Sequence, residues 1–446
     1  MKKHTQSPYE SSKVSYKPSG IEWLGEIPQS WKNVSIRSCF TESNQRCNTD
    51  SYPLLSVTIA NGIIYQDDIE NKKDISNDDK SNYKIVPLNA VAYNKMRMWQ
   101  GAVGVNTLTT GIVSPAYIVA IPNEKILPNF VSYLFKSKIM ISEFDKNSYG
   151  LCLDMNNLRY DDFRNIKIPL PPLQEQKEIA EFLDKKCEKI QNYINKKQKL
   201  ITLLQEKKQA LINEAVCGRV ACHTERSEVS TTAYKPSGIE YLGLIPHHWE
   251  VARSGLIYKN ISSGTTPQSD NDEYYKNGNI FWINSGDLND SVLTNSKNKI
   301  TQKAMMAYSA LKISPKGSLI IAMYGATIGK VSILGIDACT NQACCVLCES
   351  KYLNTRFVFY YFIAKRQDLI SMAYGGGQPN ISQDIIKNFK IPLPLLQEQK
   401  QIANFLDEKC EKINSVIEKT KKQIELIKEY KNTLINEAVC GRIRLN

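Results

Sequence analysis

Histidine, the side chain that most often serves acid–base catalysis, is scarce in this sequence. Only four occur among 446 residues: His4, His223, His247 and His248. All four lie in polar or Pro-rich segments and not in the longer apolar stretches. The sequence therefore predicts no histidine-dependent acid–base or nucleophilic site, and the candidate site has no catalytic residues.

One glycine-rich segment invites comparison with a phosphate-binding loop. Residues Gly325–Val331 read GATIGKV, but the spacing between the glycines is one residue short. Val331 also stands where such a loop carries its metal-binding Ser or Thr. No G-x-G-x-x-G motif follows a predicted strand, as a dinucleotide or methyl-donor pocket would require. We therefore expect no cofactor on this chain.

A cysteine cluster could in principle hold zinc. Cys345 and Cys348 form a C-x-x-C pair next to Cys344, with only Cys339 nearby and no histidine in the rest of the insert. A structural zinc site needs a second pair of ligands. We therefore predict a half-buried strand here and no metal, and all twelve cysteines are expected to be thiols in a reducing compartment.

Two segments combine basic, aromatic and amide side chains beside glycine-rich turns. Lys and Arg can bond guanine edges or phosphates, and Asn and Gln can pair with adenine. The alternative is that these are strand ends with solvated polar residues. Taken as groups, they predict DNA contacts by twelve residues: Tyr93, Asn94, Lys95, Arg97, Trp99, Gln100, Ser114, Tyr324, Thr327, Lys330, Asn341 and Gln342.

The overall charge agrees with a polyanionic partner. The net charge is +12 and the pI is near 8.9, although a merely soluble surface would also account for it. The N-terminus lacks the apolar core of a secretory signal, and no run approaches the roughly 18 apolar residues of a membrane helix. We expect a cytoplasmic protein with no membrane partner.

The elements that must position these residues occur twice. Each copy has an opening, a block that begins IPLP and an ending LINEAVCGR, and the copies are Tyr16–Trp31 with Tyr234–Trp249, Ile168–Ile190 with Ile391–Ile413, and Leu211–Arg219 with Leu434–Arg442. The inserts between them, residues 32–167 and 250–390, share little sequence. A duplicated frame with divergent inserts presents two different surfaces in one geometry.

The inserts nevertheless share an order of predicted elements. The first has strands near 52–58, 90–93 and 112–121 and then a helix over 130–141. The second has strands near 280–284, 318–323 and 343–347 and then a helix over 355–372. FVSYLF and FVFYYF mark the same helix in both. Each opening is expected to be irregular or a short helix that ends on an aromatic anchor.

The repeated tails predict long helices. Pro171, Pro172 and Pro394 precede them, and Gly218 and Gly441 follow their ends. The heptad positions a and d stay in register for five heptads, which indicates a coiled coil; in the first helix they are Ala180, Leu183, Cys187, Ile190, Ile194, Lys197, Ile201, Leu204, Lys208, Leu211 and Ala215. The simplest partner is the other helix of the same chain. Antiparallel pairing would put the two inserts at opposite ends of a rod. Parallel pairing would put them side by side.

The predicted fold class is thus α+β: two homologous mixed α/β domains separated by two long antiparallel helices, with pseudo-twofold symmetry. The boundaries are a disordered tail (1–15), the first domain with its lead-in (16–167), the first helix (168–219), a linker (220–233), the second domain with its lead-in (234–390) and the second helix (391–446).

Over nearly its full length the chain resembles the specificity subunit of a type I restriction–modification system. The resemblance rests on the paired KPSGIE openings, the two IPLPxLQEQKxIAxFLD blocks, the paired LINEAVCGR ends, and GATIGKV followed by TNQACCV in the second insert. The first insert departs from that pattern, with GAVGV at Gly101–Val105 and VSPAY at Val113–Tyr117.

The resemblance implies a non-catalytic subunit whose two inserts are target-recognition domains for double-stranded DNA. Each domain would read one half of a split, asymmetric site. The helices would space the domains and dock two methyltransferase subunits, and restriction and translocase subunits would join for cleavage. S-adenosylmethionine, ATP and Mg would then be bound by these partners.

Two other readings remain open at this stage. The chain could be a self-contained DNA-modifying enzyme with a hidden catalytic site, although the frame and inserts leave no room for a catalytic domain of more than about 100 residues. It could also be a coiled-coil scaffold that binds proteins.

Overall fold

The computed structural model describes residues 15–47, 52–69, 80–150, 156–220, 233–373 and 379–443. The chain forms two compact units, residues 1–197 with 421–446, and residues 198–420. Each of the two long helices contributes one stretch to each unit. Residues 1–14 of the expected tail (1–15) and residues 221–232 of the expected linker (220–233) lie outside the described residues.

The first unit is built on a small antiparallel sheet with the strand order β4-β11-β8-β9, and three further strand pairs, β1-β2, β3-β12 and β7-β10, with the hairpin β5-β6. Its strands are β1 (Tyr16–Pro18), β2 (Glu26–Pro28), β3 (Lys32–Ser35), β4 (Phe40–Ser43), β5 (Leu55–Thr58), β6 (Gly62–Tyr65), β7 (Lys84–Val86), β8 (Val91–Asn94), β9 (Val103–Val105), β10 (Gly111–Val113), β11 (Tyr117–Pro122) and β12 (Lys167–Leu170). Its short helices are α1 (Pro128–Lys136), α2 (Lys138–Lys146) and α3 (Tyr160–Phe163).

The second unit repeats the central order as β16-β23-β20-β21 and adds β18 at one edge. Its strands are β13 (Tyr234–Pro236), β14 (Leu244–Pro246), β15 (Glu250–Arg253), β16 (Ile261–Ser263), β17 (Ile280–Ile283), β18 (Val292–Leu293), β19 (Lys299–Ile300), β20 (Leu319–Ala322), β21 (Val331–Leu334), β22 (Cys339–Thr340), β23 (Cys344–Leu347) and β24 (Lys390–Leu393). Its short helices are α5 (Ser254–Ile257), α6 (Gln302–Ala307), α7 (Thr355–Ala364), α8 (Arg366–Ser371) and α9 (Gln383–Asn388). The shared strand order confirms the prediction of two similar mixed α/β domains.

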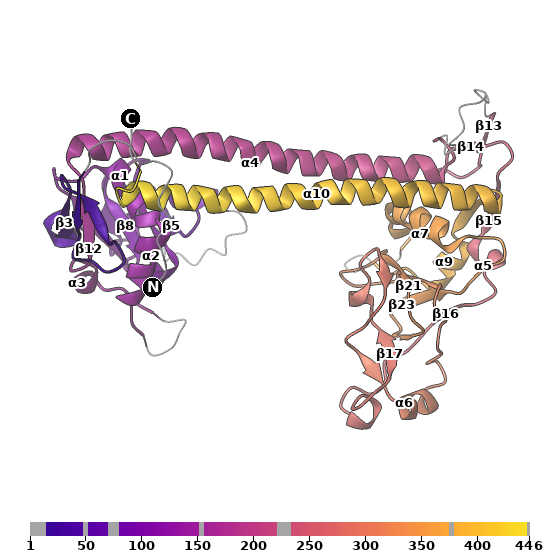
Figure 1. Ribbon diagram of the computed structural model, residues 1–446. Coiled ribbons are helices and arrows are strands. Elements are labelled where there is room, and N and C mark those ends of the chain that lie inside the picture. The colour runs from indigo at the N-terminus through magenta and orange to yellow at the C-terminus, as the bar shows by residue number, and fades with distance from the viewer. Residues whose placement is uncertain are drawn as a thin grey trace. The chain divides into compact units, whose positions relative to one another are not determined.

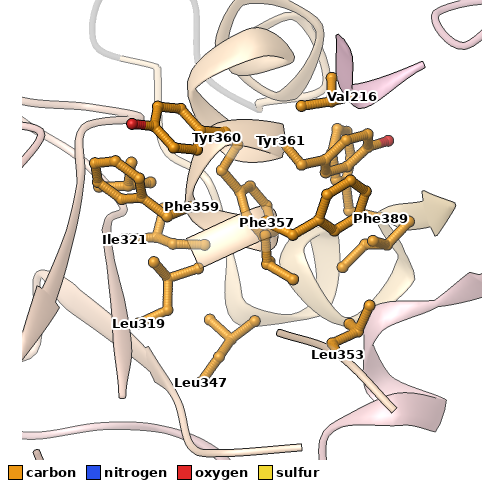
Figure 2. Packing of buried hydrophobic residues seen from close by; sticks show 14 of the residues in the cluster. Val216, Leu319, Ile321, Leu347, Leu353, Phe357, Phe359, Tyr360, Tyr361 and Phe389 are labelled. Atoms are coloured by element: carbon orange, nitrogen blue, oxygen red, sulfur yellow. The ribbon is translucent and has the colours of Figure 1, made fainter. Parts of the chain in front are cut away.

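Aromatic side chains fill the core of the second unit. Residues of α7 pack over β20 and β23, with Phe357, Tyr361 and Leu319 all fully buried (Figure 2). The helix predicted over 355–372 is broken at Lys365, where α7 ends and α8 begins. The first unit also breaks its predicted helix, at Ser137, whose hydroxyl accepts a hydrogen bond from the Met140 amide and caps α2.

The two long helices are α4 (Leu173–Val216) and α10 (Leu396–Val439), drawn in magenta and yellow in Figure 1. Every a and d position is buried or half-buried, as the heptads predict. Within the first unit, burial raises the pKa of the Cys187 thiol and Lys431 of α10 opposes that shift. Within the second unit, Lys208 Nζ donates to Asn414 Oδ1 at 2.9 Å. In both units the helix stretches pair antiparallel.

Each repeated opening forms a two-stranded hairpin, β1-β2 or β13-β14, and not the irregular or short helical segment that was predicted. It ends on a buried tryptophan, as expected. Trp31 Nε1 donates to Glu175 Oε2 at 2.6 Å, and Trp249 Nε1 donates to Glu398 Oε1 at 3.0 Å. These bonds attach each opening to the first turn of the helix that follows its insert.

The same openings receive the end of the other helix. Gly218 ends α4 with φ +73°, and a Cβ there would lie 2.5 Å from Pro246 and 2.9 Å from Trp249. Tyr234 OH donates to the Gly218 carbonyl oxygen at 3.1 Å. Gly441 meets Pro28 and Trp31 in the same manner in the first unit. A helix start and a helix end therefore converge on one tryptophan in each unit.

We predict that Gly218→Ala destabilises the second unit more than Gly238→Ala. Both glycines have a positive φ, which costs a side chain about 1–2 kcal/mol. No atom lies within 4 Å of a Cβ at Gly238, whereas one at Gly218 would overlap Pro246. The measurement is thermal unfolding followed by tryptophan fluorescence. An equal fall in unfolding temperature in the two variants would show that the added Cβ at Gly218 is accommodated without strain, and would contradict the prediction.

Candidate nucleic-acid interface

Most of the predicted contact residues of the first unit lie at the end of β8 or on the connection from β8 to β9. This segment contains a short 3₁₀ turn, Met98–Gln100, and closes on Gly101 with φ +88°. Met98 is fully buried and anchors the segment, while Arg97 is exposed and Lys95 is half-buried. We call residues 94–101 the first loop. Its two cations are the side chains best placed to meet a polyanion.

Other predicted residues hold the first loop in shape. Asn94 Oδ1 accepts a hydrogen bond from the Met96 amide at 3.0 Å, and Trp99 Nε1 donates to the Met96 carbonyl oxygen at 3.0 Å. The Gln100 Oε1 atom is buried with no hydrogen-bond partner in the part of the chain that the structure describes. Asn94 and Trp99 therefore fix the conformation of the loop through their side-chain hydrogen bonds.

Tyr93 is the predicted residue whose position argues against a DNA contact. It is fully buried, and its ring centroid lies 4.8 Å from that of Phe163. Burial raises the pKa of its hydroxyl strongly. Tyr93 is therefore a core side chain, since successive strand residues face opposite sides of the sheet and Tyr93 faces inward. We leave it out of the proposed contact set.

The second predicted segment of this insert comes beside the first loop. The Tyr117 amide donates to the Ser114 carbonyl oxygen at 3.0 Å, and Tyr117 then pairs with Asn94 across β11 and β8. Burial raises the pKa of Tyr117, while a hydrogen bond to Asn94 and the charge of Arg97 oppose the shift. Tyr117 is thus part of this surface, although it was not among the predicted contacts.

The second unit carries an equivalent connection between β20 and β21. We call residues 323–330 the second loop. Tyr324, Thr327 and Lys330 are all half-buried on it, and the Lys330 amide donates to the Thr327 carbonyl oxygen at 2.9 Å. A strand, β21, follows Lys330 directly. The helix N-terminus on which a phosphate loop depends does not follow this glycine-rich segment, in agreement with the sequence argument.

Gln342 and Tyr324 come together beside the second loop. A hydrogen bond between them lowers the pKa of Tyr324, although burial raises it more. Thr266 Oγ1 also donates to Gln342 Oε1 at 2.6 Å. Asn341 is different, because its Oδ1 accepts from the Ala343 amide at 3.1 Å and so supports the local turn.

The Thr266 segment was missed from the sequence. It is held by Trp282 Nε1, which donates to the Thr265 carbonyl oxygen at 3.2 Å, and by Tyr275 OH, which donates to the Pro267 carbonyl oxygen at 2.5 Å. A Cβ on Gly264 would lie 1.7 Å from the Thr340 carbonyl oxygen, so only glycine allows this approach. The Gly-Thr-Thr-Pro run was the available signal.

Cys339, Cys344 and Cys345 lie on strands that are fully buried and not half-buried as predicted, and Cys348 follows directly after β23. Cys344 and Cys345 are adjacent on β23 and belong to different hydrophobic clusters on its two faces. Neighbouring residues that face opposite ways cannot bind one ion together. Among the described residues no group of three or more His, Cys, Asp or Glu side chains is placed to hold a metal. In the same part of the chain, no helix is long and apolar enough to span a bilayer.

Comparison with known proteins decides the family. Residues 33–205 and 246–426 each match the model of the type I restriction modification DNA specificity domain. This chain belongs to that family. The matches cover most of the chain and contain both loops. Membership makes the chain a DNA-recognition subunit and not an enzyme, because such subunits are non-catalytic.

Relatives extend over the same length. The chain is 25% identical to the putative type I restriction enzyme MjaX specificity subunit of Methanocaldococcus jannaschii, over 95% of this chain and 96% of that protein. It is 27% identical to the MjaVIII specificity subunit of the same organism, over 75% of each. The fold is similar to the HsdS subunit from Thermoanaerobacter tengcongensis, with a TM-score of 0.54 at 18% identity over 94% of this chain and 98% of that one. A chain from a structure on assembly and conformational transition of the type I R-M system has a TM-score of 0.70 at 17% identity, over 94% and 99%.

A half-buried lysine contacts the first loop, and its pKa is lowered. Lys136 Nζ, at the end of α1, donates to the carbonyl oxygens of Thr58, Ile59 and Gly101 at 3.2, 2.8 and 2.9 Å. Burial lowers its pKa to about 8. Between this value and the ordinary pKa of about 10.5, the unfolded chain keeps a proton that the folded chain has lost. The contribution of this group to stability should therefore rise with pH in that window.

We predict that Lys136 titrates near pH 8 in the folded protein. The ¹³Cε resonances of labelled lysines would be followed between pH 6 and 11, and the Lys136→Arg variant identifies the signal by its loss. A midpoint at the ordinary lysine value would contradict the prediction that desolvation controls the protonation of this group.

Proposed function

We propose that this chain selects the DNA sequence for a type I restriction–modification complex, with each unit reading one half of a bipartite, asymmetric site. The observation that carries the proposal is the pair of equivalent loops. The first loop connects β8 to β9 and the second connects β20 to β21, which are equivalent neighbouring strands in the shared sheet order, yet the two loops present different side chains. A frame that repeats while its loops differ suits recognition of two different half-sites.

The proposed contacts divide by chemistry. Arg97 and Lys95 in the first loop and Lys330 in the second can bond guanine edges or phosphates. Gln342 offers the amide geometry that pairs with adenine, and Thr266 shares its hydrogen bond. The remaining proposed residues, which support or flank these, are Asn94, Trp99, Gln100, Ser114, Tyr324, Thr327 and Asn341.

The partners follow from the repeated frame. We propose that two methyltransferase subunits dock on the two copies and that restriction and translocase subunits join them in the cytoplasm. Gln174 and Lys177 on α4 are exposed, as are the identical Gln397 and Lys400 on α10. Packing within the chain does not require identity at exposed positions, so a shared partner surface accounts for it better. S-adenosylmethionine, ATP and Mg would be bound by these partners.

Alanine variants test the first loop. We expect Arg97→Ala to weaken binding of the assembled complex to its target by about 1–3 kcal/mol if the side chain bonds a base edge. If it bonds a phosphate, the slope of log affinity against log salt concentration should decrease by about 1, the release of one counterion. Lys167→Ala, an exposed cation on β12, is the matched control. Fluorescence anisotropy with labelled duplex at several salt concentrations measures both quantities.

The same assay applies to the second unit with Lys330→Ala and Gln342→Ala. If these variants and Arg97→Ala all bind the target as the parent does at every salt concentration, the two loops are not the reading surface. The family assignment would stand in that case, but the contact residues would have to be sought elsewhere on the inserts.

Exchange of a whole insert tests the division of labour. Residues 32–167 would be replaced by the corresponding insert of a relative with a known target. We expect the methylated motif of the assembled complex to change in one half-site and to keep the other. Sequencing that detects methylated adenine reads both halves in one experiment. A motif changed in both halves, or in neither, would contradict independent reading.

A further inference from the structure

Both loops contain a glycine whose carbonyl group is held by a cation from a neighbouring helix. In the first unit Lys136 Nζ donates to the Gly101 carbonyl oxygen at 2.9 Å. In the second unit Arg366 Nε donates to the Gly329 carbonyl oxygen at 3.0 Å. The two glycines have φ +88° and +72°, so each loop turns through the left-handed region at this residue. Both glycines are buried, and a buried carbonyl needs a donor.

An isoleucine from the next stretch of helix covers each of these glycines. A Cβ on Gly101 would lie 2.8 Å from Ile141 Cδ1, and one on Gly329 would lie 3.1 Å from Ile370 Cδ1. The same glycine is thus held by a hydrogen bond and covered by an aliphatic side chain in both units. This combination fixes the conformation of the turn at the glycine.

Each cation also ties its loop to a second turn. Lys136 reaches the carbonyl oxygens of Thr58 and Ile59 at the β5-β6 turn. Arg366 pairs with the carboxylate of Asp290, which in turn accepts a hydrogen bond from the Val331 amide at 3.1 Å. Loss of the cation would therefore release two segments at once and not a single contact.

The duplication of the frame does not explain the likeness. When FVSYLF is aligned with FVFYYF, Lys136 corresponds to Ile363 and not to Arg366. The two units use different side chains from different helix positions to reach the equivalent carbonyl. Such a coincidence points to a requirement of the loop itself.

We infer that Lys136 and Arg366 are positioning residues for DNA recognition: each holds one loop in the conformation that presents its base-contacting side chains, and neither contacts DNA itself. This inference rests on the proposed role of the two loops. The Arg366 side chain is 24% exposed and already paired with Asp290, and Lys136 Nζ donates to three carbonyl groups. Neither cation has a free charge to offer a phosphate.

The experiment compares Lys136→Met with Arg366→Met in the assembled complex. Duplexes with the target sequence, or with one base pair changed in either half-site, would be bound at several salt concentrations. We expect Lys136→Met to lose about tenfold discrimination in the half-site read by the first unit only, and Arg366→Met to do so in the other half-site. The salt dependence should equal that of the parent, because no phosphate contact is removed.

Conservative variants separate positioning from a general loss of folding. Arg366→Lys and Lys136→Arg each keep a donor to the glycine carbonyl, and we expect them to recover most of the lost discrimination. A methionine variant whose unit had unfolded would lose binding to every duplex and would show a lower unfolding temperature, whereas a positioning role removes discrimination and leaves both the unfolding temperature and much of the binding. Parent-like discrimination in both methionine variants would overturn the inference, as would a reduced salt dependence, which would make the cations direct phosphate contacts.

The loop variants show which idea has failed. If Arg97→Ala and Lys330→Ala reduce binding while both methionine variants behave as the parent, the loops read DNA but need no cation to hold them. If all four variants behave as the parent, the proposed reading surface is wrong and the positioning role falls with it.

Discussion

The hydrogen bond from a buried tryptophan to a glutamate at a helix start is the contact on which the two units depend. Trp31 and Glu175 make it in one unit, and Trp249 and Glu398 in the other. The glycine that ends the other long helix packs on the same tryptophan. One aromatic ring thus joins a helix start, a helix end and the hairpin that leads into the insert. Because a tryptophan buries a large area and directs its single donor, the junction has one geometry.

That junction allows the inserts to diverge. The central sheets of the two units keep one strand order. The antiparallel helix stretches of each unit belong to the repeated frame and not to the inserts. Residues on the β8–β9 and β20–β21 loops can then differ in sequence without loss of the core. Because the loops differ, each needs its own contacts to hold its conformation. Lys136 in one unit and Arg366 in the other supply them through hydrogen bonds to a glycine carbonyl oxygen.

Periodicity and repetition predicted the frame well, because heptads and terminal Pro and Gly residues depend on local sequence. They failed where long-range packing decides. The helix breaks at Ser137 and Lys365 lie in short polar stretches whose side chains alone do not predict a break. Tyr93 could be assigned to the core only once the inward face of β8 was known. Thr266 was missed because its partner Gln342 lies far along the chain. A lysine that bonds backbone carbonyl groups leaves no sequence pattern, so Lys136 could not be found in advance.

The central claim is that this one chain chooses a two-part DNA sequence for a modifying complex. The most direct measurement maps methylated adenine across the host genome in cells with the gene and in cells from which it has been deleted. The account predicts that deletion removes methylation from one motif, made of two different specific half-sites separated by a fixed number of unspecified base pairs. Unchanged methylation in the deletion strain, or loss of a continuous or palindromic motif, would contradict it.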